Sequence, residues 1–77
     1  MKIEVLGTGC AKCKTLEKVV QEAVAKSGKF AQIVKVEDIM KIMEYQVLST
    51  PALVIDGKVV SSGRVLSVDE VLAFINA

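Results

Sequence analysis

Apolar and polar residues follow two different periods in the first half of the chain. The runs 2–6 and 32–36 are short, apolar and rich in β-branched residues, which predicts a strand at each. From about Ala11 to Lys26, apolar residues recur at helical spacing with charged residues opposite, which predicts an amphipathic helix. Its apolar stripe consists of Leu16, Val19, Val20, Ala23 and Val24. A strand, a helix and a second strand in this order favour a right-handed βαβ unit with parallel strands.

A short helix is predicted directly after the second strand. Asp38 has the side chain of a good N-cap, and the helix should run to about Tyr45. Its inward face should carry Ile39, Ile42 and Met43. The helical spacing of the methionines predicts that they fill space in the core.

Asp56-Gly57 separates two β-rich runs, 52–55 and 58–61, and such a dipeptide is the strongest short-range signal for a β-hairpin. The cross-strand pairs expected from a two-residue turn are Val54–Val59 and Leu53–Val60.

The end of the chain predicts a third helix, from Val68 to about Asn76. Ser67 and Glu70 have the spacing of a capping box, and Leu66 and Val71 that of a hydrophobic staple. The buried stripe should consist of Val68, Val71, Leu72 and Ile75. The element order is therefore βαβαββα, an α/β fold in which a four-stranded mixed sheet carries helices on both faces.

Composition narrows the class of protein. With 77 residues, the chain should form one domain, 1–77, and its 52% hydrophobic content supports a compact core. A net charge of +1 gives no reason to expect nucleic-acid binding. The chain shows no signal-peptide pattern and no apolar run of membrane length. We therefore expect a cytoplasmic protein that does not act at a membrane, and we expect it to be a monomer.

The candidate chemistry lies in Cys10-Ala11-Lys12-Cys13, between the first strand and the first helix. Two intervening residues at the first turn of a helix bring two cysteines within disulfide reach. Cys10 lies nearer the open end, where free backbone N–H groups favour a thiolate, and Lys12 should favour it further. Cys13 should be the shielded thiol that resolves a mixed disulfide.

A CxxC pair has other uses. The chain contains no histidine, which excludes a Cys/His zinc site, and two thiolates fall short of the four ligands of structural zinc. Two thiolates do suit Cu(I). Cysteines are also common as small buried apolar residues. From the motif alone, redox chemistry, a soft metal and a structural role all remain open.

Three features together resemble a known family. They are the CxxC after the first strand, Thr50-Pro51 directly before the third strand, and the hairpin followed by a final helix. Over essentially the whole chain, this arrangement resembles the thioredoxin fold and the small glutaredoxin-like or thioredoxin-like redox-active disulfide proteins; the stretch 49–57 is especially similar. The resemblance implies a cis Pro51, with Thr50 beside the dithiol and able to pair with an extended substrate segment.

The resemblance also implies a function. Cys10 would attack a protein or small-molecule disulfide, and Cys13 would displace the reduced product. No metal and no cofactor other than the Cys10–Cys13 disulfide is expected, and a reductase or small thiol would supply electrons. The alternative is a Cu(I)-type carrier that uses the same two thiolates. Small Cu(I) chaperones end in a strand, whereas this chain should end in a helix. An adaptor role is disfavoured because we expect no exposed apolar stripe.

Three further residues are candidate modulators. Glu4 lies six residues before Cys10, where thioredoxins carry a buried acid. It is either a solvated charge pointing away from Ile3 and Val5 or, if buried, a proton acceptor for Cys13. Gly63 lies in a loop that should border the dithiol and allow close approach of a substrate. Lys12 should stabilise the Cys10 thiolate and make the protein more oxidising.

This chain also departs from familiar thioredoxins. Ala11-Lys12 separates the cysteines, and no tryptophan precedes Cys10. Its redox potential and its choice of partner therefore cannot be carried over. Arg64, in the same loop as Gly63, could meet acidic groups of a substrate, although a residue of this kind is more often a solvated charge.

Overall fold

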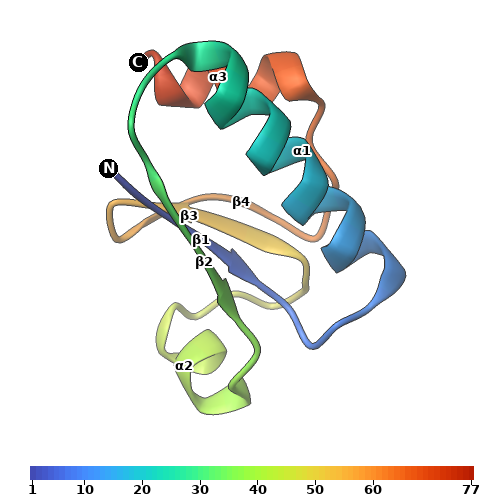
Figure 1. Cartoon of the computed structure of the whole chain (residues 1–77). Coiled ribbons are helices and arrows are strands. Elements are labelled where there is room, and N and C mark those ends of the chain that lie inside the picture. Colours follow the sequence, from blue (N-terminus) through green and yellow to red (C-terminus); the bar gives the residue numbers. More distant parts are fainter.

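The computed structural model describes residues 1–77 and confirms the predicted element order (Figure 1). The elements are β1 (Lys2–Leu6), α1 (Ala11–Ser27), β2 (Gln32–Val36), α2 (Ile39–Glu44), β3 (Ala52–Ile55), β4 (Lys58–Ser62) and α3 (Val68–Ile75). No helix combines the length and apolar character needed to span a bilayer.

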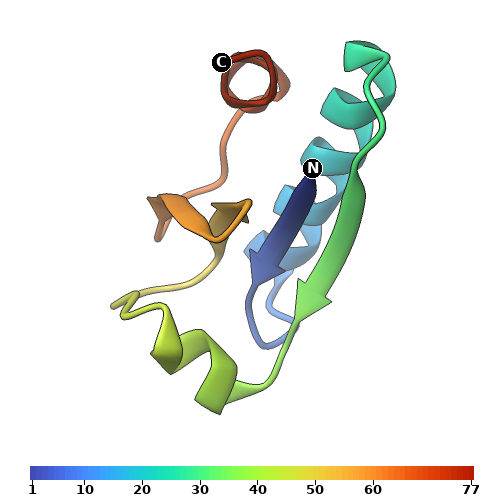
Figure 2. The ribbon, with the colours of Figure 1, turned by 90° about the vertical axis from the view of Figure 1, so that its left-hand side faces the viewer.

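The four strands form one mixed sheet in the order β2-β1-β3-β4. β1 and β2 are parallel, as the βαβ pattern predicts, while β3 is antiparallel to both β1 and β4. α1 and α3 cover one face of the sheet and α2 covers the other (Figure 1). Figure 2 shows β1 and β2 pointing toward the same edge, from which the chain continues into the CxxC loop and into α2.

Each face of the sheet has its own apolar cluster, because side chains alternate along a strand. The larger cluster lies under α1 and α3 and consists of Ile3, Val5, Leu16, Val20, Ala23, Leu53, Leu66, Val71 and Ile75. The smaller cluster lies under α2 and consists of Leu6, Val36, Ile42, Ala52 and Val54. The larger cluster fixes α1 on the sheet, and with it the CxxC pair at its first turn.

The predicted inward face of α2 is largely wrong. Asp38 caps the helix as expected, with its carboxylate 2.9 Å from the backbone nitrogen of Met40, and Ile42 is buried. Ile39 and Met43, however, are 60% and 63% exposed. The helix has only six residues, so a single position reaches the sheet. Met40 is also exposed, and Leu48 beyond the helix is fully so, so the methionines do not fill the core and the chain does present apolar side chains to solvent.

The hairpin register is half as predicted. Val54 faces Val59, but Leu53 faces Ser61 instead of Val60 because the register shifts between Leu53 and Val54. The shift is a β-bulge, which places one additional residue on β4, an edge strand where bulges are common. As a result, Val60 packs against the larger cluster without a direct partner on β3.

α3 begins as the sequence predicts. The Ser67 hydroxyl accepts from the Glu70 backbone N–H, and the Glu70 carboxylate accepts from the Ser67 backbone N–H, forming the capping box. The Arg64 guanidinium donates to the same carboxylate at 2.7 Å, so Arg64 is ion-paired. The backbone N–H of Ser67, followed by the Arg64 guanidinium, lowers the pKa of Glu70 below its ordinary value. Leu66 and Val71, the predicted staple, are both buried in the larger cluster.

Candidate active site

The two cysteines lie where strand β1 gives way to helix α1, and they form a disulfide. Their Cα atoms are 5.1 Å apart, inside the range that a disulfide requires. Cys10 is the N-cap of α1, and its sulfur accepts from the backbone N–H of Cys13 at 3.1 Å. Cys10 is exposed, whereas Cys13 is only 2% exposed. One sulfur therefore faces incoming molecules and the other lies behind it.

Local charge favours an anion at Cys10. The first turn of α1 contains no acidic residue, and Lys12 and Lys14 are both exposed next to the cysteines. The free backbone N–H groups of a helix N-terminus stabilise negative charge, and the two ammonium groups act in the same direction. When the disulfide is reduced, these groups stabilise a thiolate at Cys10.

One acidic residue at this edge of the sheet, Glu37, was not predicted from the sequence. A Cβ atom on Gly9, the residue before Cys10, would lie 3.6 Å from a carboxylate oxygen of Glu37. The parallel pairing of β1 and β2 brings Glu37 here, because the carboxyl ends of both strands reach the same edge. Glu37 therefore places a carboxylate beside Gly9, the residue that precedes Cys10. Its position directly after a parallel strand is the signal that could have indicated it.

The peptide bond between Thr50 and Pro51 is cis, as the resemblance implies. Pro51 is buried and Thr50 is exposed. Ala52, the next residue, pairs with Leu6 at the end of β1. This pairing places Pro51 opposite Gly7, and Gly7 in turn lies against the Cys13 sulfur. The sheet thus brings the proline loop beside the dithiol.

Gly63 supports the proline loop. Its backbone N–H donates to the Pro51 carbonyl at 2.8 Å, and its φ is +75°, which favours glycine. A Cβ atom on Gly63 would collide with the Ser49 hydroxyl. Gly63 therefore permits close packing between the loop before α3 and the loop that carries Thr50 and Pro51.

Glu4 is buried, at 9% exposure, so of the two alternatives for this residue the solvated one is wrong. As predicted, its side chain points away from Ile3 and Val5, and this places it on the face of the sheet that α2 covers. Its carboxylate accepts from the Tyr45 hydroxyl at 2.8 Å, and Lys2 lies 4.0 Å away. α1, which carries Cys13, covers the opposite face, so the structure does not gather Glu4 into the dithiol site.

Tyr45 follows α2 as its C-cap, and its hydroxyl connects that end of the helix to β1. Nothing in the spacing of the sequence links Tyr45 to Glu4, which lies 41 positions earlier. The hydrogen bond to Glu4, then burial, then the negative charges of Glu4 and Glu44 raise the pKa of Tyr45 above its ordinary value of 10.0. Because this pKa is raised in the folded protein, the contribution to stability is present below pH 10 and is lost as pH rises through the folded value.

The phenol titration tests this contact. Tyr45 is the only tyrosine and the chain has no tryptophan, so phenolate absorbance reports one residue. We expect the midpoint to lie above that of the unfolded chain and to fall in Glu4→Gln, which removes the largest contribution. Glu44→Gln, which removes the smallest contribution, should shift the midpoint less. Equal midpoints in the wild type and Glu4→Gln would contradict the contact.

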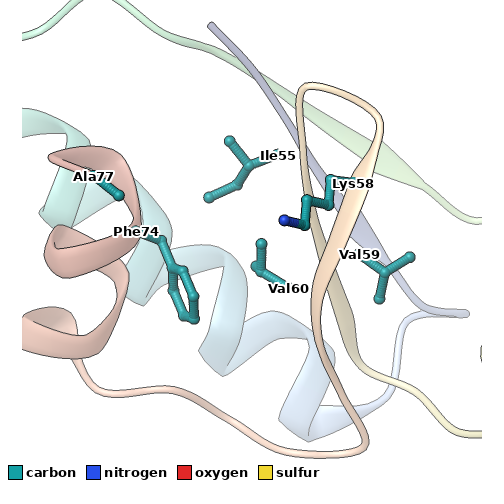
Figure 3. A pocket seen from close by; sticks show the side chains of 6 residues that line it. All are labelled: Ile55, Lys58, Val59, Val60, Phe74 and Ala77. Atoms are coloured by element: carbon teal, nitrogen blue, oxygen red, sulfur yellow. The ribbon is translucent and has the colours of Figure 1, made fainter.

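A cavity of about 390 Å³ lies elsewhere (Figure 3). It is lined by Ile55, Lys58, Val59, Val60, Phe74 and Ala77. These residues come from the end of β3, the beginning of β4 and the C-terminal end of the chain, whereas Pro51 lies at the other end of β3. The cavity and the dithiol are thus separate features.

Fold and site together define an α/β dithiol protein in which a CxxC disulfide at the N-terminus of a helix lies beside a loop that carries a cis proline.

Comparison with known proteins agrees with this class. The sequence model of one family, described as a thioredoxin domain, matches residues 1–76. A thioredoxin from Methanothermobacter thermautotrophicus is 41% identical over 71 residues, which cover 92% of this chain and 92% of the relative. A thioredoxin from Methanocaldococcus jannaschii is 41% identical over 69 residues, which cover 90% of this chain and 79% of the relative. The chain belongs to the thioredoxin domain family.

Membership of this family and the Cys10–Cys13 disulfide support thiol–disulfide oxidoreductase chemistry. They do not favour the soft-metal carrier, which the sequence alone left open.

Proposed function

We propose that this protein reduces disulfide bonds in other proteins, with Cys10 as the attacking thiolate and Cys13 as the resolving thiol. The observation that carries the proposal is the unequal exposure of a bonded pair, in which Cys10 is open to solvent at the helix N-terminus and Cys13 is buried. Only the exposed sulfur can meet a disulfide on a large partner. The buried sulfur is protected from the same partner but remains within bonding distance of Cys10.

The reaction balances over two exchanges. The Cys10 thiolate attacks one sulfur of the substrate disulfide, so a Cys10–substrate disulfide forms and the other substrate sulfur leaves as a thiolate. The Cys13 thiolate then attacks the Cys10 sulfur, which forms the Cys10–Cys13 disulfide and releases the second substrate thiolate. Two electrons pass from the dithiol to the substrate. A reductase or a small thiol returns them to this chain.

The proline loop is the proposed docking element for the substrate. Thr50 is exposed, and only Pro51 separates it from strand β3. The pairing of β1 with β3 brings this loop beside Gly7, which lies against the Cys13 sulfur. An extended substrate segment can pair with the backbone there as an added strand, which would hold its disulfide near Cys10. Pro51 fixes the path of this loop, and the backbone N–H of Gly63 donates a hydrogen bond to the Pro51 carbonyl, which holds the loop in place.

Two other charged residues act on the site. Lys12 stabilises the Cys10 thiolate, and Glu37 partly offsets it. Glu4 faces α2, so any effect on protons at Cys13 crosses the sheet and is weaker than the sequence suggested. A dithiol that acts as a reductant needs a compartment that keeps thiols reduced, which is a property of the cytoplasm.

The test is steady-state turnover with dithiothreitol as the electron donor. We expect the protein to accelerate reduction of a protein disulfide and to act less on oxidised glutathione, which lacks an extended segment to pair with the proline loop. No acceleration of either reaction would contradict the proposal. A clear preference for oxidised glutathione would retain the dithiol chemistry but overturn the protein-substrate assignment.

A further inference from the structure

We propose that Gly7 is a positioning residue for the Cys10–Cys13 couple, because the space left by its missing side chain is occupied by the Cys13 sulfur. This inference rests on the proposed redox function of the pair. A Cβ atom at Gly7 would overlap the Cys13 sulfur and would lie 3.0 Å from the Cys13 Cβ. Gly7 itself is buried between the end of β1 and the cysteine loop.

The requirement at Gly7 concerns space and not backbone conformation. The other four glycines, Gly9, Gly28, Gly57 and Gly63, all have positive φ, a region that favours glycine, but Gly7 does not. An alanine at position 7 could therefore adopt the same backbone. The obstacle is the Cys13 side chain, in which the sulfur is nearest and the Cβ follows at 3.0 Å, so the Gly7→Ala substitution isolates the contact with one residue.

Neither side of this contact moves freely. The Gly7 backbone N–H donates to the Val36 carbonyl at 3.0 Å, and the preceding residue, Leu6, pairs with both β2 and β3. Cys13 lies in the first turn of α1, which Leu16 fixes in the larger cluster. In the disulfide form, the bond to Cys10 also fixes the Cys13 sulfur.

The two oxidation states therefore respond differently to an added methyl group. In the dithiol form, the Cys13 sulfur can rotate about its Cα–Cβ bond and move away from position 7. In the disulfide form it cannot rotate without breaking the bond to Cys10. Overpacking a well-packed site is destabilising, and here most of that cost falls on the disulfide form. Gly7→Ala should accordingly favour the dithiol and slow the step in which Cys13 displaces a substrate.

The experiment is a redox equilibrium of the wild type and Gly7→Ala in glutathione buffers, quenched by alkylation and read by mass spectrometry. We expect Gly7→Ala to need about tenfold more oxidising buffer at its midpoint, which corresponds to ~30 mV for a two-electron couple. Gly28→Ala is the matched control. Gly28 has a φ of +69° and open space around it, so alanine there lowers stability without touching the cysteines, and its midpoint should equal that of the wild type.

An unchanged midpoint in Gly7→Ala would overturn the inference, as would an equal shift in Gly28→Ala. If Gly7→Ala does not fold, the same substitution is made with Cys13→Ala, which removes the sulfur. Folding of the double variant supports the contact. Failure of the double variant to fold, while Cys13→Ala alone does fold, would show that the sulfur is not the obstacle and would overturn the inference. The wild type separates the two proposals. If it exchanges with glutathione, only the inference on Gly7 is at stake. If it does not, the proposed function itself fails, and comparing the folding of Gly7→Ala with that of the double variant still tests the contact.

Discussion

Cys10→Ser should reduce catalysed disulfide reduction to the background rate, because a serine hydroxyl cannot begin thiol–disulfide exchange. Cys10 is the exposed member of the pair and the N-cap of α1, so Cys13, which is 2% exposed, cannot replace it as the attacking thiol. Serine is itself a good N-cap, and α1 should therefore remain intact. The measurement is turnover with a protein disulfide substrate, with circular dichroism to show that the fold is retained.

Cys13→Ser is the matched variant and should fail at a different step. Cys10 can still attack, but the mixed disulfide has no internal thiol to resolve it. A covalent complex with the substrate should accumulate, visible on a non-reducing gel and reversed by dithiothreitol. Full turnover in Cys10→Ser, or a covalent complex formed through Cys13 in that variant, would reverse the roles assigned to the two sulfurs.

Leu16→Ala should remove a large part of the stability of the fold. At ~0.05–0.15 kcal/mol per residue, 77 residues give a total of about 4–12 kcal/mol. Leu16 is fully buried in the larger cluster beneath α1, and truncating a buried leucine costs ~2–5 kcal/mol. The free energy of unfolding should fall by that amount in urea denaturation followed by circular dichroism, with the disulfide intact in both proteins.

Lys18→Ala is the control for this loss. Lys18 is exposed on the same helix, and its side chain makes no hydrogen bond and no ion pair. Alanine also has a high helix propensity, so the stability of Lys18→Ala should stay close to that of the wild type. Similar losses in the two variants would mean that burial of Leu16 does not anchor α1, and with it the cysteine pair.

Features that depend on neighbouring residues could be predicted from the sequence. The strand bounds 2–6 and 32–36 match, because each run is short and rich in β-branched residues. The capping box at Ser67 and the turn at Asp56-Gly57 also match, because both are local chemistry. The family motif placed the cysteine pair and the cis peptide before Pro51 correctly.

Features that depend on distant segments could not be predicted. The periodicity of α2 indicates an apolar side but does not reveal that so short a helix covers the sheet with Ile42 alone. The bulge in β4 produces no recognisable sequence pattern, because it lies in a run of β-branched residues. The contact between Glu4 and Tyr45, and the approach of Glu37 to Gly9, arise only when the strands pair. The same holds for the space that Gly7 leaves to Cys13.

The most direct measurement is a single turnover between the fully reduced protein and a protein that carries one accessible disulfide. Samples are quenched by alkylation, and the sulfurs are assigned by peptide mapping. We predict that one Cys10–Cys13 disulfide appears for each substrate disulfide lost, with any transient adduct on Cys10. Loss of the substrate disulfide while Cys10 and Cys13 both remain thiols, or no loss at all, would contradict a catalytic dithiol in this protein.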